Sequence, residues 1–216
     1  MNRRATLMSY FQAMHLALGD SGWWPAKTPF AVMLGAVLTQ NTSWKGVAKA
    51  MANLEAEDLL DPAALRDLPV ARLEELIRPA GYFRLKAKRL GNLLDYLDQA
   101  CAFDLAALKA RDMAELRQEL LGVSGIGPET ADSILLYALG QPSFVIDAYT
   151  RRILSRHGLV PADEPYEDLR DFFMDALDHD PALFNEFHAL LVRVGHHFCK
   201  PGKPLCAICP LDSFPH

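Results

Sequence analysis

Hydrophobic residues in this chain recur at intervals of three and four positions almost from end to end, which is the spacing of one face of an α-helix. Strand-like alternation is limited to one short apolar piece, Phe144 to Ile146. Prolines fall where several helices would begin, as expected for a residue that the first helical turn tolerates. The sequence therefore predicts an all-α protein of about ten helices. The helical pattern is clear over residues 7–18, 47–54, 65–77, 90–97, 113–121, 130–139, 169–177 and 183–194.

Length and composition allow a real core and exclude a membrane-spanning helix. The chain has 216 residues, 50% hydrophobic and 23% charged, which suits one large domain or two small ones. The longest apolar run, Pro29 to Leu38, has ten residues, about half of the ~20 that a membrane-spanning helix needs. Arg3 and Arg4 are not followed by an apolar segment, so no secretory signal is visible. We expect a cytoplasmic protein without a membrane partner.

The charge balance weighs at first against nucleic acid as a partner. The net charge is −5, whereas phosphate binding rewards clustered lysine and arginine. The distribution matters more than the total, and basic residues gather in three places: Arg84 to Arg89, Arg151 to Arg156, and Arg193 to Lys203. These clusters suit contacts with DNA phosphates, and solvated helix faces are the alternative interpretation.

A glycine-containing turn lies between two predicted helices. Gly125 and Gly127 permit positive φ and a close backbone approach, and the next helix begins at Pro128. Free amide groups at that helix start form a site suited to a phosphate. A plain helical hairpin would show the same pattern, so the turn alone does not decide between the two.

Asp147 follows a short apolar run and opens a predicted helix, and capping that helix would by itself explain an aspartate at this position. Taken together, however, several motifs resemble the helix-hairpin-helix glycosylase superfamily of endonuclease III and the adenine glycosylases. The resemblance rests on Gly125-Ile126-Gly127 with Thr130-Ala131, on Asp147, on Leu38-Thr39-Gln40-Asn41-Thr42, and on Gly81-Tyr82-Phe83 followed by Lys86-Ala87-Lys88.

This resemblance implies two helical domains with a DNA-binding groove between them. One would be a central barrel over residues 29–135, and the other would combine 1–28 with 136–216. The damaged nucleotide would turn out of the duplex, and Asp147 would stabilise positive charge on the sugar as the base departs. Gln40 or Asn41 would fill the gap in the base stack. The further candidate DNA contacts are Gly125, Gly127, Thr130 and Arg151.

Position 129 departs from the bifunctional members, which carry a lysine there. This chain has Glu129, and a carboxylate cannot form a Schiff base with the sugar. The resemblance therefore implies a monofunctional glycosylase without strand-cleaving activity. Glu129 would either complement the helix start or contact the substrate.

The tryptophans bear on the substrate. Trp23, Trp24 and Pro25 precede the barrel and Trp44 follows the Gln40 segment, and together with Glu129 they are the candidate base pocket. Electron-rich rings attract cationic N-alkyl purines and stack on any base. The motifs resemble the 3-methyladenine glycosylase branch, so we expect alkylated purines as substrates. The alternative interpretation of one or two of these tryptophans is that they are core residues. The alternative function is that of a uracil, thymine-mismatch or oxidised-pyrimidine glycosylase.

Cys199, Cys206 and Cys209 match three of the four cysteines that hold a [4Fe–4S] cluster in many relatives. The fourth would fall at Pro215, and His216 beside it is a candidate replacement. The alternatives are a non-protein fourth ligand, zinc bound with a histidine, or an empty loop. A cluster here would brace the basic segment without taking part in redox chemistry.

A second function class is a DNA-damage binder that has lost turnover, and Asp147 distinguishes it from an enzyme because a binder needs no carboxylate there. Double-stranded DNA with a damaged base is the expected partner in both cases. We expect a monomer that associates with the nucleoid.

Overall fold

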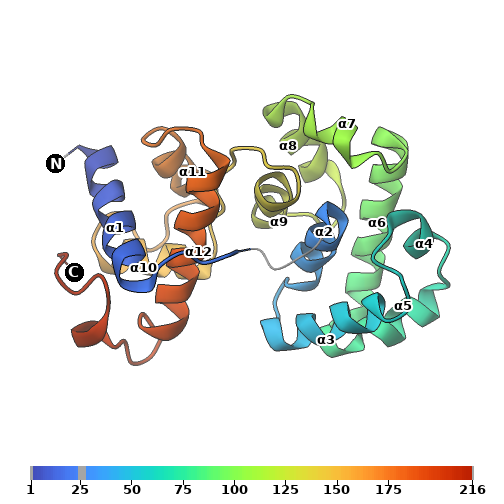
Figure 1. The fold of residues 1–216 in the computed structure, drawn as a ribbon, viewed down its shortest axis with the longest axis horizontal. Coiled ribbons are helices and arrows are strands. Elements are labelled where there is room, and N and C mark those ends of the chain that lie inside the picture. Colours follow the sequence, from blue (N-terminus) through green and yellow to red (C-terminus); the bar gives the residue numbers. More distant parts are fainter. Residues whose placement is uncertain (1, 24–27, 216) are drawn as a thin grey trace. The chain divides into compact units, whose positions relative to one another are not determined.

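The computed structural model describes residues 2–23 and 28–215, and every regular element in these two ranges is helical, with no β-strand (Figure 1). The expected all-α class is confirmed for this part of the chain. No described helix is long and apolar enough to cross a membrane. The helices are α1 (Arg3–Leu18), α2 (Pro29–Leu38), α3 (Trp44–Glu55), α4 (Pro62–Arg66), α5 (Val70–Ile77), η1 (Arg78–Ala80), α6 (Phe83–Cys101), α7 (Leu105–Lys109), α8 (Met113–Gly122), α9 (Pro128–Ser133), η2 (Ile134–Ala138), α10 (Ala148–Arg156), α11 (Tyr166–Met174), α12 (Pro181–His197) and η3 (Cys206–Ile208).

The chain divides into two compact units. Unit 1 combines Met1–Trp23 with Pro142–His216, and unit 2 is Trp24–Gln141. The sequence predicted a central domain over residues 29–135, whereas unit 2 covers Trp24–Gln141. Residues 136–141 stay with unit 2 because Ala138 and Leu139 are buried in its core.

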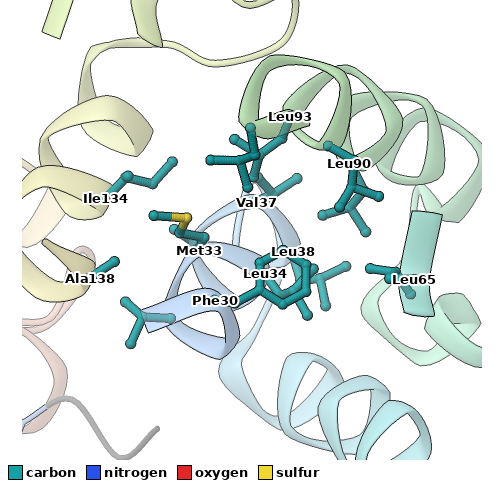
Figure 2. Packing of buried hydrophobic residues seen from close by; sticks show 14 of the residues in the cluster. Phe30, Met33, Leu34, Val37, Leu38, Leu65, Leu90, Leu93, Ile134 and Ala138 are labelled. Atoms are coloured by element: carbon teal, nitrogen blue, oxygen red, sulfur yellow. The ribbon is translucent and has the colours of Figure 1, made fainter. Parts of the chain in front are cut away.

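Helix α2 is the centre of unit 2. Thr28 caps it through a hydrogen bond from the Ala31 amide (3.2 Å), and every residue from Phe30 to Leu38 is buried. A helix that is apolar on all sides needs neighbours all round it, and α2 packs against α3, α6, α9 and η2. In Figure 2, Leu90 and Leu93 of α6 and Ile134 of η2 surround it. This central helix therefore fixes where the following loop, residues 39–43, leaves the core.

Two segments differ from the sequence pattern. The predicted helix over 65–77 is broken into α4 and α5, because Pro69 has no N–H to continue the first helix and instead precedes the second. Phe144 to Ile146 is buried but forms no strand, since no described segment pairs with it.

Unit 1 is built on α1, α10, α11 and α12, around an aromatic core. The rings of Phe144 and Phe173 stack at 3.8 Å, and Phe187 lies edge-on to both. Helices α10 and α12 approach closely at Gly195, where an added Cβ would lie 2.4 Å from the Tyr149 ring. This close contact sets the position of the α10 N-terminus, where Asp147 lies.

Candidate functional site

The hairpin predicted from the sequence is present in unit 2. Helices α8 and α9 are joined by residues 123–127, and Gly125 has a φ of +97° that side-chain-bearing residues rarely adopt. Ile126 anchors the turn in the core, whereas Gly125 and Gly127 are exposed. Gly127 is the N-cap residue of α9. The turn thus presents backbone to solvent from a fixed apolar anchor.

A buried ion pair joins the two helices of this hairpin. Arg117 of α8 donates two hydrogen bonds to the carboxylate of Asp132 in α9, at 2.8 and 3.1 Å. Asp132 is completely buried and Arg117 nearly so. Two parallel N–H···O bonds fix both distance and orientation, so the pair sets how α8 and α9 meet. The sequence gave no indication of this ion pair, because a lone arginine on one helix and a lone aspartate on the next do not show that they meet.

Gln40 connects the loop after α2 to the hairpin. Its side-chain amide donates to the Gly125 carbonyl (3.0 Å) and to the Thr130 hydroxyl (2.9 Å), and Arg89 donates to its oxygen. Three of the predicted DNA-binding residues therefore lie together in the structure. Thr130, however, is buried, and its hydroxyl accepts an internal hydrogen bond. Asn41 is exposed at the loop tip with a φ of +53°.

Lys86 joins the loop after α2, residues 39–43, to a second loop, residues 81–82, which lies between η1 and α6. This lysine is completely buried, and its ammonium donates to the carbonyls of Leu38 (2.7 Å) and Ala80 (2.8 Å), at the ends of α2 and η1. Burial, with nearby Arg89, lowers the pKa of Lys86 to about 8. The sequence counted Lys86 in a basic surface cluster, which was wrong because its ammonium satisfies two buried carbonyls instead.

Tyr82, at the tip of this second loop, belongs to a motif quoted from the sequence but was not among the candidate site residues. It has a φ of +45°, and it is one of the most exposed large hydrophobic residues described, at 69%. The hydroxyl of Thr42 lies 3.8 Å from where a Cβ on Gly81 would be, so the two loops touch. A strained, exposed aromatic residue at the tip of a loop is unusual in a packed domain and indicates a contact surface.

The candidate base-pocket residues are distributed over both units. Trp44 begins α3 and is 40% exposed, and Glu129 is exposed in the first turn of α9. Trp23 is half-buried in unit 1, where its amide donates to the Ser21 hydroxyl (3.2 Å). Trp24 and Pro25 lie outside the described residues.

Asp147 caps α10 with one of its two oxygens. Oδ1 accepts a hydrogen bond from the Thr150 amide (2.7 Å), which is the capping role considered from the sequence. Oδ2 lies 3.8 Å from Nε2 of His188 on α12, and the Asp147 side chain is 13% exposed. Capping thus occupies one oxygen and fixes the carboxylate, and the second oxygen points to a different neighbour.

Comparison with known proteins identifies the family. The description "HhH-GPD superfamily base excision DNA repair protein" matches residues 34–179, which include the hairpin and Asp147. The chain belongs to the HhH-GPD superfamily. It is a DNA glycosylase of base excision repair, and its partner is DNA.

Individual members of the superfamily support this assignment. The Putative DNA repair glycosylase MJ1434 of Methanocaldococcus jannaschii is 45% identical over 197 residues, covering 91% of this chain and 89% of that protein. A 3-methyladenine DNA glycosylase of H. pylori, solved with 1,N6-ethenoadenine, has a TM-score of 0.78 at 27% identity, covering 91% of this chain and 98% of the other. An endonuclease III–DNA covalent intermediate shares the fold, with a TM-score of 0.82 at 23% identity, over 98% and 94% of the two chains.

In this HhH-GPD protein, the arginines after Asp147 serve unit 1 itself. Arg151 donates to the Glu164 carbonyl. Arg152 donates to the carbonyl of Gly195 (3.0 Å), in the last turn of α12, and to that of Cys199 (2.7 Å), just after the helix. Because Arg151 donates one N–H group to Glu164, only its remaining N–H groups are candidates for a contact with DNA.

The three C-terminal cysteines line one cavity of about 190 Å³ within unit 1. Cys199 is buried, Cys209 half-buried and Cys206 exposed. Arg156 donates to the Cys199 sulfur (3.4 Å), and the Leu211 amide donates to the Cys209 sulfur (3.5 Å). Burial raises the pKa of the Cys209 thiol, and the neighbouring cysteine sulfurs raise it further. All three cysteines thus line the same cavity.

The spacing of these sulfurs can be compared with that of zinc ligands. Tetrahedral zinc with bonds of about 2.3 Å holds its sulfur ligands about 3.8 Å apart. The three cysteine sulfurs, all of them described, do not lie within 4.8 Å of one another as a set. As they lie in the structure, the three sulfurs do not surround a single zinc ion. His216, the predicted fourth ligand, lies outside the described residues.

Replacing Gly125 with Ala is expected to destabilise the hairpin and weaken DNA binding. The positive φ disfavours any side chain, and an added Cβ would lie 2.4 Å from Cγ of Arg89, which also holds Gln40. Strain of this kind costs roughly 1–3 kcal/mol. Urea unfolding and fluorescence anisotropy with duplex DNA would measure the two effects. Gly91→Ala is the matched control because its Cβ would meet nothing within 4 Å, and equal effects of both substitutions would contradict the prediction.

The stability of the protein is expected to fall below neutral pH because of His188. Burial lowers the pKa of this histidine from 6.5, and Asp147 opposes the shift. As the pH falls below about 6.5 the unfolded chain therefore takes up protons more readily than the folded one, and the free energy of unfolding decreases. Above about pH 6.5, His188 is neutral in both the folded and the unfolded chain, so its titration no longer changes the free energy of unfolding.

Urea unfolding at about pH 7.5 and about pH 5.5 would measure this effect. His188→Gln should reduce the difference between the two values. The exposed His196 is not in this buried setting, so His196→Gln should leave the difference unchanged. An identical pH dependence in all three proteins would refute the role given to His188.

Proposed function

We propose that this glycosylase is monofunctional and releases N-alkylated purines such as 3-methyladenine, leaving an abasic site. The observation that carries the proposal is Glu129 in the first turn of α9, at the position where the resemblance places the lysine of strand-cleaving members. Asp147, held by α10, would supply the anion that assists departure of the base.

The main requirement of the proposed reaction is a negative charge held beside C1′ of the sugar. When a base leaves, the sugar acquires oxocarbenium character, and a fixed carboxylate beside C1′ lowers the energy of that state. The Thr150 amide fixes one oxygen of Asp147, so the second oxygen is oriented in advance. The same carboxylate can orient the attacking water or take its proton. Burial favours neutral His188, which would leave the negative charge on Asp147 uncompensated near neutral pH.

The preference for alkylated purines rests on the tryptophans and on one relative. Trp44 is exposed enough to stack on a base, and stacking contributes about 1–3 kcal/mol without reading base identity. A cationic alkylpurine gains about 0.5–2 kcal/mol more over an aromatic face. The H. pylori relative is a 3-methyladenine glycosylase solved with a modified adenine, and it is similar over most of both chains.

Of the two candidates for filling the gap in the base stack, the geometry favours Asn41. The Gln40 side chain makes internal hydrogen bonds with the hairpin and with Arg89, whereas Asn41 is exposed at the loop tip. Inserting Gln40 would break its internal bonds. Asn41→Ala should therefore weaken binding to lesion-bearing duplex without loosening the hairpin.

The cysteine cavity would hold a [4Fe–4S] cluster through Cys199, Cys206 and Cys209. Bound there, a cluster supplies a rigid cross-link between α12 and the C-terminal loop. Arg156 of α10 already holds this loop by donating to the carbonyls of Lys200 and Pro201. The proposed role is structural, holding the basic segment 196–203 in one shape for DNA phosphates.

A panel of lesion-bearing duplexes tests the substrate. The protein should release 3-methyladenine and leave duplexes with thymine glycol, uracil or a G·T mismatch unchanged. Release of oxidised pyrimidines alone would reassign it to the endonuclease III type. A protein that binds every duplex and releases no base would be a DNA-damage binder.

Borohydride trapping tests the proposed absence of a Schiff base. The wild-type protein should give no covalent adduct with damaged DNA, because no amine lies at position 129. Glu129→Lys restores an amine there and should become trappable, and Glu129→Gln, which removes the charge without adding an amine, should not. An adduct with the wild-type protein would overturn the monofunctional assignment.

A further inference from the structure

Three side chains with metal-binding atoms meet at the end of α1, within unit 1. His15 lies in the last turn of α1, Asp20 in the loop that follows, and Glu186 in α12, which packs against α1 (Figure 1). One donor atom from each, a ring nitrogen and two carboxylate oxygens, lies within 4.8 Å of the other two. Among the residues that the structure describes, no other three histidine, cysteine or acidic side chains come this close together.

The imidazole of His15 carries a buried nitrogen without a hydrogen bond. Nδ1 is inaccessible to solvent and has no hydrogen-bond partner. It lies 4.0 Å from Oε1 of Glu186, and Nε2 lies 3.6 Å from Oδ1 of Asp20. Both distances are too long for a hydrogen bond, and a small inward shift would bring them to the roughly 3.3 Å that separates nitrogen and oxygen ligands of one zinc ion. Buried polar atoms without a partner are uncommon, and a bound ion is one of the reasons for them.

The carboxylate of Glu186 is already oriented by Ser21. Oε1 accepts a hydrogen bond from the Ser21 amide (2.9 Å), and Oε2 accepts one from its hydroxyl (2.6 Å). Each oxygen keeps a further lone pair, so these bonds orient the carboxylate and leave it able to bind an ion. Arg193 holds the same loop by donating to the carbonyls of Leu18 (2.7 Å) and Gly19 (2.9 Å). Outer hydrogen bonds of this kind commonly orient the carboxylates that bind metals.

The charge of the group favours a cation. Within the described part of the chain, neither Asp20 nor Glu186 pairs with a lysine or an arginine, and His15 is the basic side chain that faces both. We propose that His15, Asp20 and Glu186 bind a divalent transition-metal ion of the zinc and manganese class, through one ring nitrogen and one oxygen of each carboxylate. Imidazole suits zinc and carboxylate suits manganese, whereas softer ions prefer thiolates. The inference is independent of the glycosylase mechanism and of the cysteine cavity.

A bound ion would tie the end of α1 to α12 and fix the loop between its ligands. This loop leads to Trp23, whose amide donates to the Ser21 hydroxyl (3.2 Å). The three ligands come together only in the folded chain, so the ion should bind that form and stabilise it. The melting temperature should therefore rise with the concentration of the metal.

Titration of the full chain with manganese(II) tests the site, because manganese prefers oxygen ligands to thiolates and so reports little on the cysteine cavity. The sharp electron paramagnetic resonance signal of free manganese should decrease as one ion binds per chain. Pulsed measurements should detect coupling to a histidine nitrogen, and zinc, which binds such ligands more tightly, should displace the manganese. A wild-type protein without saturable manganese binding would overturn the proposal.

Asp20→Asn is the most direct variant, because Asp20 is exposed and its side chain takes no part in the core. We expect its manganese affinity to fall at least about tenfold and the rise in melting temperature to disappear. Ser21→Ala removes an outer partner of Glu186 and should weaken binding by about 10- to 100-fold. Asp168→Asn, at an exposed aspartate in the first turn of α11, is the matched control and should bind as the wild type does.

The remaining outcomes would place the ion elsewhere. If nitrogen coupling persists in His15→Ala and disappears in His196→Ala, the ion binds the exposed neighbours His196 and His197, and the proposal is wrong. Equal binding by the wild type, Asp20→Asn and Asp168→Asn would show an adventitious ion only, which also contradicts it. Base release is measured on the same samples, so a failed metal site does not count against the glycosylase assignment.

Discussion

Asp147→Asn is expected to reduce the rate of base release by about 10²- to 10³-fold, the range observed when one preorganised electrostatic group is removed from an active site. Asparagine caps helices about as well as aspartate, so the bond from the Thr150 amide and the α10 N-terminus should survive. The substitution therefore removes charge with little change in structure. Single-turnover release of 3-methyladenine would measure the rate, and fluorescence anisotropy would show that DNA binding is retained.

A second aspartate gives a matched control for this result. Asp180 caps α12 in the same unit, where its side chain accepts a hydrogen bond from the Ala182 amide (2.9 Å). Asp180→Asn makes the same chemical change at another helix start and should leave base release unaltered. If Asp147→Asn also leaves the rate unaltered, Asp147 is a cap and nothing more.

Breaking the buried Arg117–Asp132 pair is expected to lower the free energy of unfolding by about 3–5 kcal/mol. Either Arg117→Met or Asp132→Asn leaves the other residue buried without the opposite charge of this pair, and the measurement reports the cost of that buried charge. Because the pair joins α8 to α9, DNA affinity should fall with stability. Urea unfolding monitored by circular dichroism measures the first effect, and anisotropy measures the second.

Two further variants show whether the loss comes from the stranded charge. Replacing both partners, as in Arg117→Met with Asp132→Leu, removes the desolvated charge and should recover much of the stability. Arg4→Met breaks an ion pair with Asp178 that lies on the surface, and should cause no measurable change. If Arg117→Met also causes no measurable change in the free energy of unfolding, the apolar residues of the hairpin alone hold α8 and α9 together.

The local features of the site could be predicted from the sequence. The hairpin turn needs Gly125 because of a backbone angle, and α10 begins at Asp147 because an aspartate caps its own helix three residues on. The departure at Glu129 is likewise a property of one position. Each depends on residues within one turn or one helix start, and short-range geometry of this kind follows from residue type.

The long-range contacts could not be predicted in the same way. Lys86 appeared to be a surface cation because nothing near it in sequence shows that the Leu38 carbonyl, 48 residues away, needs a donor. Gln40 and Thr130 are 90 residues apart, and their hydrogen bond exists only because α2 and α9 pack together. The ring of His157 meets Pro215 across 58 residues.

The amino-acid sequence alone determined the helical class, the hairpin, the capping carboxylate and the amine-free position 129, since helix periodicity, glycine backbone freedom and side-chain chemistry act locally. Only the tertiary structure decided which polar groups are consumed inside the protein and which remain for DNA or metal. Lys86, Gln40 and Thr130 are hydrogen-bonded internally, whereas Asn41 and Tyr82 are exposed. The physical reason is that a buried polar group must find its partner wherever packing brings one, regardless of distance along the chain.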